Sequence, residues 1–185
     1  IFVDQNNDGV INDADKTAIG CASPDVFGAF NLALRYRQFT LDANFGYSIG
    51  NDAYNYTRRL LESQSAFYNQ STSVLNRWQV EGQVTDMPRA NYGDNIGNNS
   101  FSDRWIEDAS YFKLRSLKFS YNFGKIFGFV NSGNVWVAAE NLFTLTKYLG
   151  SDPEFAYGYT ASMRGFDYSK VSLPRTFKVG FDLNF

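Results

Sequence analysis

The chain of 185 residues has no histidine, four prolines and a single cysteine. Without histidine it lacks the commonest general base, the Ser-His-Asp triad and most zinc sites. One cysteine excludes an intrachain disulfide, and we expect Cys21 to be a small buried thiol. No apolar run approaches the roughly 18 residues of a transmembrane helix. The formal net charge of −2 excludes the basic footprint of a nucleic-acid-binding protein.

Aromatic residues are abundant instead. The chain has 18 Phe and 12 Tyr, and hydrophobic residues make up 44% of it, yet Asn, Asp, Ser, Gln and Gly lie between them. Such a composition fits β-structure with aromatic girdles better than a helical bundle, and the strands of a membrane barrel give only a weak hydropathy signal.

Residues 174–185 alternate between apolar and polar side chains over about ten residues, the length that a tilted strand needs to cross a bilayer. The apolar positions are Phe177, Val179, Phe181, Leu183 and Phe185. The positions between them are small or polar and include Lys178 and Asp182. A strand with these two faces fits a barrel wall between lipid and a wet lumen, although a strand of a soluble sandwich also alternates.

Four more segments show the same period of two, at 26–36, 39–49, 110–123 and about 134–146. Only two residues separate the first two segments, which predicts a β-hairpin over 26–49. The other two predict a second hairpin over 110–146. The fold class is therefore all-β, with about five antiparallel strands.

Two local features of the second hairpin lead to further predictions. In its first strand, strict alternation places Tyr111, Lys113 and Arg115 on the same outward face as Leu117, as in a strand that projects beyond the bilayer. In its second strand, Glu140-Asn141 interrupts the alternation, and a β-bulge is expected there.

The connections are very unequal in length, with short turns at 37–38 and 124–133 and long loops at 50–109 and 147–173. Outer-membrane barrels have short periplasmic turns and longer extracellular loops. This pattern places residues 1–25, 50–109 and 147–173 outside a bacterial cell, with the last strand at 174–185. Residues 57–79 lack Gly and Pro and predict one or two short helices. Five strands cannot close a barrel, so the rest of the wall must come from the remainder of the same polypeptide.

Residues 4–15 have the spacing of a calcium-binding loop, D-Q-N-N-D-G-V-I-N-D-A-D. Oxygen-bearing side chains recur at the ligand positions, and a glycine stands at the sharp turn. Asp15 replaces the usual final Glu, so its bidentate reach is shorter. The predicted structural Ca²⁺ ligands are Asp4, Asn6, Asp8, the Val10 carbonyl, Asn12 and Asp15. The alternative is an Asn/Asp-rich turn without metal.

The carboxylates Asp152 and Glu154 could in principle serve glycoside hydrolysis, but acidic loop residues are usually only solvated, and we expect no enzyme. Aromatic side chains in the loops could stack on sugars, but we expect them to pack within the loops or against a partner. They are Tyr92, Trp105, Tyr148, Phe155, Tyr157, Tyr159 and Phe166.

Several segments resemble one family over essentially the whole chain. S-D-R-W-I-E-D-A-S-Y-F-K-L-R-S-L (102–117) resembles the entry to a late strand of SusC/RagA-type TonB-dependent outer-membrane transporters. A-A-E-N-L-F-T-L-T-K-Y-L-G-S-D-P-E (138–154) is similar to their penultimate strand, and L-P-R-T-F-K-V-G-F-D-L-N-F (173–185) to their C-terminal strand. The opening I-F-V-D-Q-N-N-D-G is not that of a signal peptide, and we expect a fragment or a processed chain.

The resemblance implies the C-terminal end of a 22-stranded transmembrane β-barrel that imports oligosaccharides or peptides. It further implies a SusD-type lipoprotein as an extracellular lid, contact with lipid and lipopolysaccharide, and coupling to TonB only through a missing N-terminal part. Two alternatives stay open. One is a soluble secreted calcium-stabilised binding module of dockerin or adhesin type, and the other is a glycosidase fragment.

Overall fold

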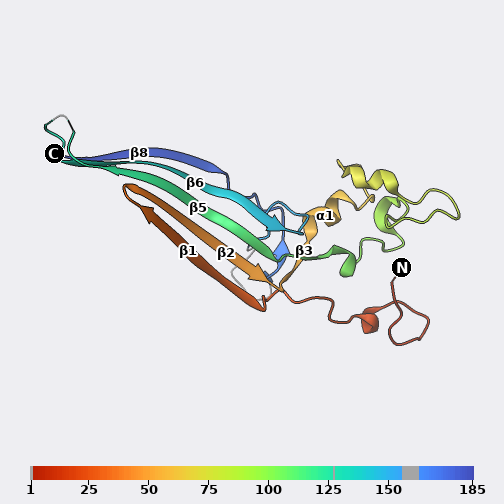
Figure 1. Ribbon diagram of the computed structural model, residues 1–185. Helices are drawn as coiled ribbons and strands as arrows, with labels where there is room; N and C mark the ends of the chain where they lie inside the picture. The colour runs from red at the N-terminus through yellow and green to blue at the C-terminus, as the bar shows by residue number, and fades with distance from the viewer. Residues whose placement is uncertain (1, 127, 156–162) are drawn as a thin grey trace.

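The computed structural model describes residues 2–126, 128–155 and 163–185, which form a long sheet with a cluster of loops at one end (Figure 1). The sheet has five strands in the order β1-β2-β5-β6-β8. Their bounds are β1 Val26–Tyr36, β2 Phe39–Ile49, β5 Tyr111–Phe123, β6 Ser132–Thr146 and β8 Thr176–Asn184. Every neighbouring pair in this sheet is antiparallel, and the predicted all-β fold with five strands is confirmed.

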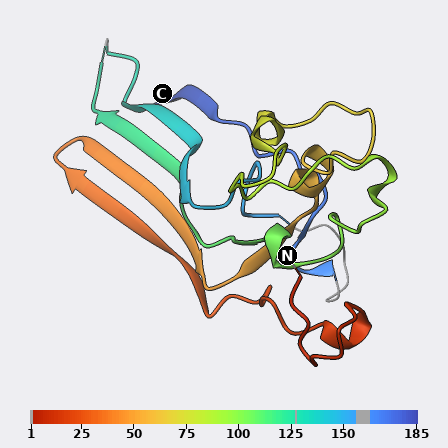
Figure 2. The same ribbon diagram turned by 90° about the vertical axis from the view of Figure 1, so that its right-hand side faces the viewer.

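The connections sort by length as expected. The β1–β2 and β5–β6 turns lie at the end of the sheet where the C-terminus lies, and the loops and the N-terminus lie at the other end (Figure 1). Arg37, in the two-residue hairpin turn, has a φ of 52°, the left-handed sense that such a turn needs. Strands β1 and β8 lie at opposite edges of the sheet (Figure 2), so their outer hydrogen-bonding groups have no partner strand within the described residues.

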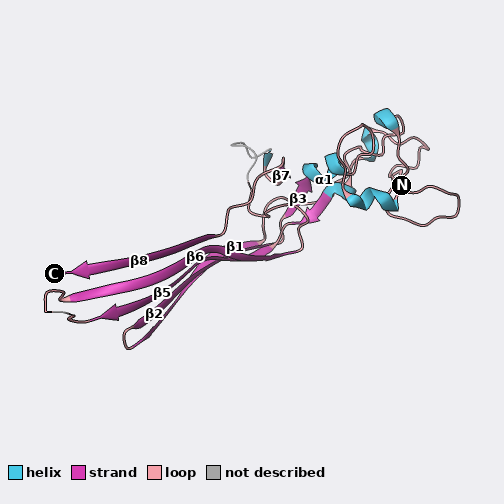
Figure 3. Ribbon diagram, turned by 90° about the horizontal axis from the view of Figure 1, so that it is seen from above, coloured by secondary structure: helices cyan, strands magenta, loops and turns pink. Residues whose placement is uncertain are grey.

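A second sheet, which the sequence did not predict, lies inside the segments that we expected to be loops. Strand β3 (Asp52–Asn55) pairs antiparallel with β4 (Ile106–Asp108) and parallel with β7 (Phe166–Asp167). Figure 3 shows it between the long sheet and the helices. Strands of two to four residues are too short to show a period of two, which is why sequence patterning missed them.

The helices are short and lie in the loop cluster, apart from η1 (Asp13–Asp15) near the N-terminus. Within 57–79, where we predicted one or two helices, the structure has α1 (Tyr56–Leu61) and η2 (Thr72–Asn76). Two further 3₁₀ turns are η3 (Tyr92–Asp94) and η4 (Asp103–Trp105). Among the described residues, no helix has the length and apolar character needed to cross a membrane. Cys21 is exposed, so its predicted burial is wrong.

The long sheet has one apolar and one polar face. Cross-strand register places Leu41 opposite Phe119, Phe119 opposite Val137, and Val137 opposite Val179, so that one face is apolar from strand to strand. Phe119, Val137 and Val179 are 44%, 47% and 78% exposed in the chain alone. An apolar surface of this kind marks an interface with lipid or with another protein.

The prediction that Lys113 and Arg115 share the face of Leu117 is wrong. Leu114 and Ser116 pair with Phe45 and Asn44, which are consecutive in β2, so Arg115 is an extra residue relative to that strand. Because one inserted residue reverses the alternation, Leu114 joins the apolar face beside Phe45, and Lys113 lies on the polar face opposite Gly46. Tyr111 is displaced in the same way and lies opposite Ser48.

The bulge expected at Glu140-Asn141 is confirmed. Ser116 pairs with Glu140 and Leu114 with Phe143, so β6 carries two residues opposite Arg115. Asn141 has a φ of 54°, a left-handed conformation that asparagine tolerates, and its side-chain amide donates to the Pro174 carbonyl at 3.1 Å.

Candidate functional site

A charged clamp joins β5 to the segment after β6. The Lys113 ammonium lies 3.0 Å from Asp152 Oδ2 and 3.2 Å from Glu154 Oε2, and the Lys113 side chain is 2% exposed. Arg115 Nη2 contacts Glu154 Oε1 at 2.6 Å in a more open setting. The bulge at Arg115 brings both cations to the polar face, where residues 147–155 fold over the sheet. The clamp therefore fixes a long loop to the wall.

These contacts also bear on the glycosidase alternative. Each carboxylate accepts hydrogen bonds from a cation, and Asp152 Oδ1 also accepts the Glu154 amide at 3.0 Å. Both carboxylates are therefore engaged in ion pairs that hold the loop. The geometry of Asp152 and Glu154 is that of structural anions.

A second charged cluster holds the loop 50–109 together around a buried indole. Arg58 Nη1 lies 2.9 Å from Glu107 Oε1, and its Nε lies 3.3 Å from Glu62 Oε1. Trp105 is 0% exposed, and the Arg104 guanidinium lies over its ring, 4.5 Å from a centroid. Cation–π and ion-pair contacts replace a large apolar core here.

The second long loop docks onto this cluster through a buried tyrosine. Tyr148 Oη donates to Asp167 Oδ2 at 2.6 Å, and the ring packs near Phe155, Ala53 and Ala109. Burial, and then the hydrogen bond and negative charge of Asp167, raise the pKa of the Tyr148 hydroxyl far above its usual value. A hollow of about 340 Å³ with a mixed lining lies beside it, and Arg58, Glu62 and Asp167 are among the residues that line it.

The aromatic residues singled out in the loops mostly pack within the loop cluster. Trp105 and Tyr148 are buried, and Phe166 lies 5.0 Å from the Tyr54 ring, measured between centroids. Tyr92 is an exception, since it is 70% exposed and lies against Phe67. The preference for packing over sugar stacking is therefore confirmed for Trp105 and Tyr148. Tyr157 and Tyr159 lie outside the described residues.

The expected calcium ligands lie on one exposed loop that is closed by hydrogen bonds. The Gln5 amide donates to Asp15 Oδ1 at 2.8 Å, which joins the two ends of the loop, and the Gly9 amide donates to Asp4 Oδ2 at 2.7 Å. Hydrogen bonds from the Asn12 and Gln5 amides lower the pKa of Asp15. Within the described ranges, no three Cys, Asp or Glu side chains are grouped as metal ligands.

Polar side chains interact from strand to strand on the face of the long sheet opposite its apolar face. Lys178 Nζ lies 2.6 Å from Glu140 Oε1, and Lys118 Nζ lies 4.8 Å from the centroid of the Trp136 ring. Asn134 donates to Asn122 Oδ1 at 2.6 Å. These groups are partly exposed and are suited to a wet surface.

Comparison with known proteins gives the class of this fold and site. No family model matches the chain. The chain is 33% identical, over its whole length, to TonB-dependent receptor P3 of Formosa agariphila and 26% identical to TonB-dependent receptor SusC of Bacteroides thetaiotaomicron. It covers 19% of the first and 17% of the second.

Solved structures agree with the sequence relatives. The RagAB peptide importer in its open–open state superposes with a TM-score of 0.73 and 25% identity, over 88% of this chain and 17% of that chain. The closed–closed state gives the same TM-score over 89% of this chain. The proteins that match are transporters and receptors, not enzymes. The resemblance to SusC/RagA-type TonB-dependent receptors is confirmed: the chain is related to them over its whole length and spans about a fifth of the length of the curated relatives it matches.

Proposed function

We propose that the chain is part of a TonB-dependent nutrient importer in a bacterial outer membrane. It supplies five strands of the barrel wall and the extracellular loops above them. The observation that carries this proposal is a five-stranded antiparallel sheet with one apolar and one polar face, in a chain related throughout to TonB-dependent receptors. Lipid and lipopolysaccharide cover the apolar face, the remaining strands pair with β1 and β8, and TonB acts through the part of the receptor outside this chain.

The loops contact a SusD-type lipoprotein in this proposal. Support comes from apolar side chains of the segment 50–109, which stand far from the sheet and are highly exposed. We call these residues the loop patch: Phe67 at 93%, Tyr68 at 77%, Leu75 at 70%, Val84 at 99% and Tyr92 at 70%. Exposed apolar residues in such number favour a protein partner.

The substrate is an oligosaccharide or a peptide. SusC and the RagAB peptide importer are both similar to this chain at 25–26% identity, so the comparisons do not separate the two classes. Growth of a strain that lacks the whole receptor, on oligopeptides or on oligosaccharides as the limiting nutrient, assigns the class. Normal uptake of both would contradict the importer proposal.

Native purification tests the assembly. We expect the whole receptor to fractionate with outer membranes, to need detergent for release, and to co-migrate with a lipoprotein identified by mass spectrometry. Phe67→Glu with Val84→Glu should remove the lipoprotein, whereas Val171→Glu, at an 85% exposed position outside the loop patch, should retain it. Recovery of the receptor in the soluble fraction would instead favour the secreted binding module.

We also propose that the loop 4–15 binds Ca²⁺ as a structural clip. Its closure across ten residues brings the predicted ligands onto one turn. The Asp15 carboxylate accepts two backbone amides and that of Asp4 accepts three, so each keeps an unused acceptor position. Calcium takes six to eight oxygen ligands and tolerates irregular geometry. Asp4, Asn6, Asp8, Asn12 and Asp15 would supply side-chain oxygens, and Val10 its carbonyl.

Limited proteolysis of the whole receptor, with and without a chelator, tests the clip. Chelation should speed cleavage within residues 1–25, and Asp4→Ala with Asp8→Ala should give the fast rate at all calcium concentrations. Asp13→Ala is the control, because Asp13 pairs with Lys16 at 2.6 Å and is not an expected ligand. Equal cleavage rates with and without chelator would contradict the proposal.

A further inference from the structure

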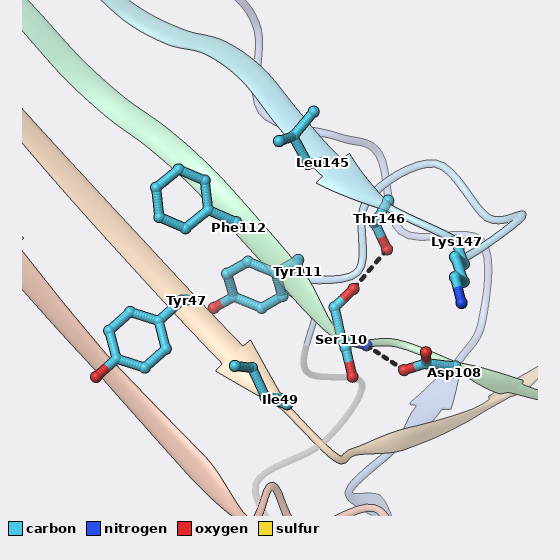
Figure 4. Close-up of a pocket in the computed structure, with 9 residues that line it drawn as sticks. All are labelled: Tyr47, Ile49, Asp108, Ser110, Tyr111, Phe112, Leu145, Thr146 and Lys147. Atoms are coloured by element: carbon cyan, nitrogen blue, oxygen red, sulfur yellow. Dashed lines mark hydrogen bonds between the residues drawn. The ribbon is translucent and has the colours of Figure 1, made fainter.

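A groove lies on the apolar face of the long sheet, where the strands meet the loop cluster. We call it the rim groove. Figure 4 shows that its lining residues come from the loop ends of β2, β5 and β6 and from the segments that adjoin β5 and β6 there. Its volume is about 480 Å³, within the usual range of ligand sites, and its lining is mainly apolar.

The walls of the groove continue the apolar face. Tyr47 and Phe112 lie opposite one another in the pairing of β2 with β5. Phe112 also lies opposite Leu145 of β6, which is 61% exposed, and Ile49 at the end of β2 is 54% exposed. The Phe112 ring lies 5.4 Å from the Phe45 ring, measured between centroids, so the apolar surface runs on down the sheet without a break. The groove therefore opens towards whatever covers the apolar face, and its walls suit acyl chains.

The position of the groove along the sheet decides which leaflet of a membrane it faces. It lies at the loop end of the sheet, and the short turns lie at the other end (Figure 1). In the proposed function the loop end is extracellular, so the groove faces the outer leaflet, which consists of lipopolysaccharide. The membrane-embedded part of lipopolysaccharide is lipid A, a phosphorylated sugar that carries several acyl chains. An occupant at this level therefore brings apolar chains, a phosphate and polar groups of a sugar.

A cation and a carboxylate line the loop end of the groove. Lys147 follows Leu145 by two positions, is exposed, and makes no hydrogen bond or ion pair with any described residue. Asp108 Oδ1 accepts the Ser110 amide at 2.9 Å. Hydrogen bonds from Ser110, and then the positive charge of Lys147, lower the pKa of the Asp108 carboxyl. The groove therefore offers an ammonium with three donors for a phosphate, and a carboxylate with further acceptor positions for a hydroxyl or an amide.

We propose that the rim groove binds the lipid A part of one lipopolysaccharide molecule. The inference rests on the proposed function, because it takes the apolar face as lipid-facing and the loop end as extracellular. Acyl chains lie along Ile49, Phe112 and Leu145, the Lys147 ammonium pairs with a phosphate, and the Asp108 carboxylate accepts hydrogen bonds from the sugar. Continuity with the apolar face, the unpaired cation at the rim and the side of the membrane all favour this occupant. A single Lys near an anionic membrane surface is enough to change affinity about fivefold.

Native mass spectrometry of the whole receptor, titrated in detergent with lipid A, tests the assignment. Phosphorylated and dephosphorylated lipid A are the two probes. The wild type should retain the phosphorylated form about fivefold more tightly, and Lys147→Ala should abolish this preference without weakening retention of the dephosphorylated form. Ile49→Trp should weaken retention of both forms, because its indole fills the groove while suiting the membrane interface. Lys170→Ala is the matched control, since it removes an exposed lysine that does not line the groove and should bind as the wild type does.

Three outcomes would overturn the assignment. A phosphate preference in Lys147→Ala that equals that of Lys170→Ala would remove Lys147 as the phosphate partner. Undiminished retention by Ile49→Trp would remove the groove as the site. Phosphatidic acid, which has a phosphate and acyl chains but no sugar, would remove lipid A as the occupant if it bound as tightly as phosphorylated lipid A.

Fractionation of each variant separates this inference from the function on which it rests. A receptor absent from the outer membrane contradicts the proposed function. A correctly located receptor without the expected lipid selectivity contradicts only the assignment of lipid A to the rim groove.

Discussion

The long sheet and the loop cluster reach stability by opposite means. In the sheet, strand pairing satisfies the backbone, and the apolar side chains face outward, with Val179 78% exposed in the chain alone. In the loop cluster, by contrast, the side chains of Trp105 and Asn55 are fully buried, and ion pairs and hydrogen bonds surround them. The sheet therefore depends on its surroundings, and the cluster depends on its own side chains.

This difference has a physical origin. A strand between lipid and water needs only alternation, because the backbone bonds are supplied by its neighbours. Loops above a membrane must instead satisfy their own polar groups, and buried charges stay buried only when they are paired. In the sheet, a substitution should therefore change stability through the match between the new side chain and the lipid or water that it faces. In the cluster, it should change stability by leaving a buried polar group without its partner.

The largest effect is expected for removal of the buried cation of the clamp. Lys113→Met leaves Asp152 buried without its ammonium, which should cost about 3–5 kcal/mol of local stability. The measurement is amide hydrogen exchange of residues 147–155 in the whole receptor. The double variant with Asp152→Asn should recover most of the loss. Equal protection in Lys113→Met and the wild type would show that the clamp does not hold the loop.

A charge placed on the apolar face should come next. Val137→Glu puts a carboxylate into lipid and should cost on the order of 2 kcal/mol. Ala138→Glu, one residue along, is the matched control, because its two neighbours in register are Lys118 and Lys178. Unfolding of the whole receptor in vesicles compares the two. Equal losses for both variants would contradict the assignment of lipid and water to the two faces.

The tyrosine that docks the second loop should give an alkaline transition. Burial and Asp167 raise the pKa of Tyr148 in the folded state, so the folded loop retains a proton that the unfolded loop loses. Docking should be fully stable below pH 10, the ordinary value for a tyrosine, and should weaken above it. Tyr148→Phe should remove this pH dependence and, by leaving Asp167 Oδ2 without the Tyr148 hydroxyl as its donor, cost about 1–3 kcal/mol at neutral pH. Cleavage of the loop as a function of pH is the measurement, and an unchanged alkaline transition in Tyr148→Phe would assign it to another group.

The smallest effect is expected at the polar face. Lys178 and Glu140 pair at 2.6 Å, but their side chains are 49% and 39% exposed, so water screens the attraction. Lys178→Met should change the free energy of unfolding by less than about 1 kcal/mol. A loss as large as that of Lys113→Met would show that the polar face is dry in the assembled receptor.

Sequence patterning predicted what depends on alternation. The bounds of β1 and β2 follow the predicted 26–36 and 39–49, and the bulge at Glu140-Asn141 was visible as an interruption. The bulge at Arg115 was not visible, because Leu114 and Leu117 are both apolar and either parity gives a plausible strand. The error at Lys113 follows from that one inserted residue.

The loop cluster was less predictable because its contacts are far apart in the chain. Asn55 bonds to Glu107 across 52 positions, and Thr57 to Ser169 across 112. Neither pair leaves a local pattern, and β7 is only two residues long. The calcium-type spacing of residues 4–15 can be recognised in the sequence because all the expected ligands lie on one short segment. Metal binding there stays a prediction.

Because Arg115 is an extra residue in β5, the number of residues in this strand determines which side chains lie on each face. Deleting this one residue would leave the composition almost unchanged, yet it would turn Lys113 towards the bilayer and Leu114 towards the polar face. In the long loops, the same deletion would only shorten a connection. The part of β5 between Phe112 and Leu117 should therefore tolerate many substitutions but no insertion or deletion. The number of residues in this segment is a structural constraint in its own right.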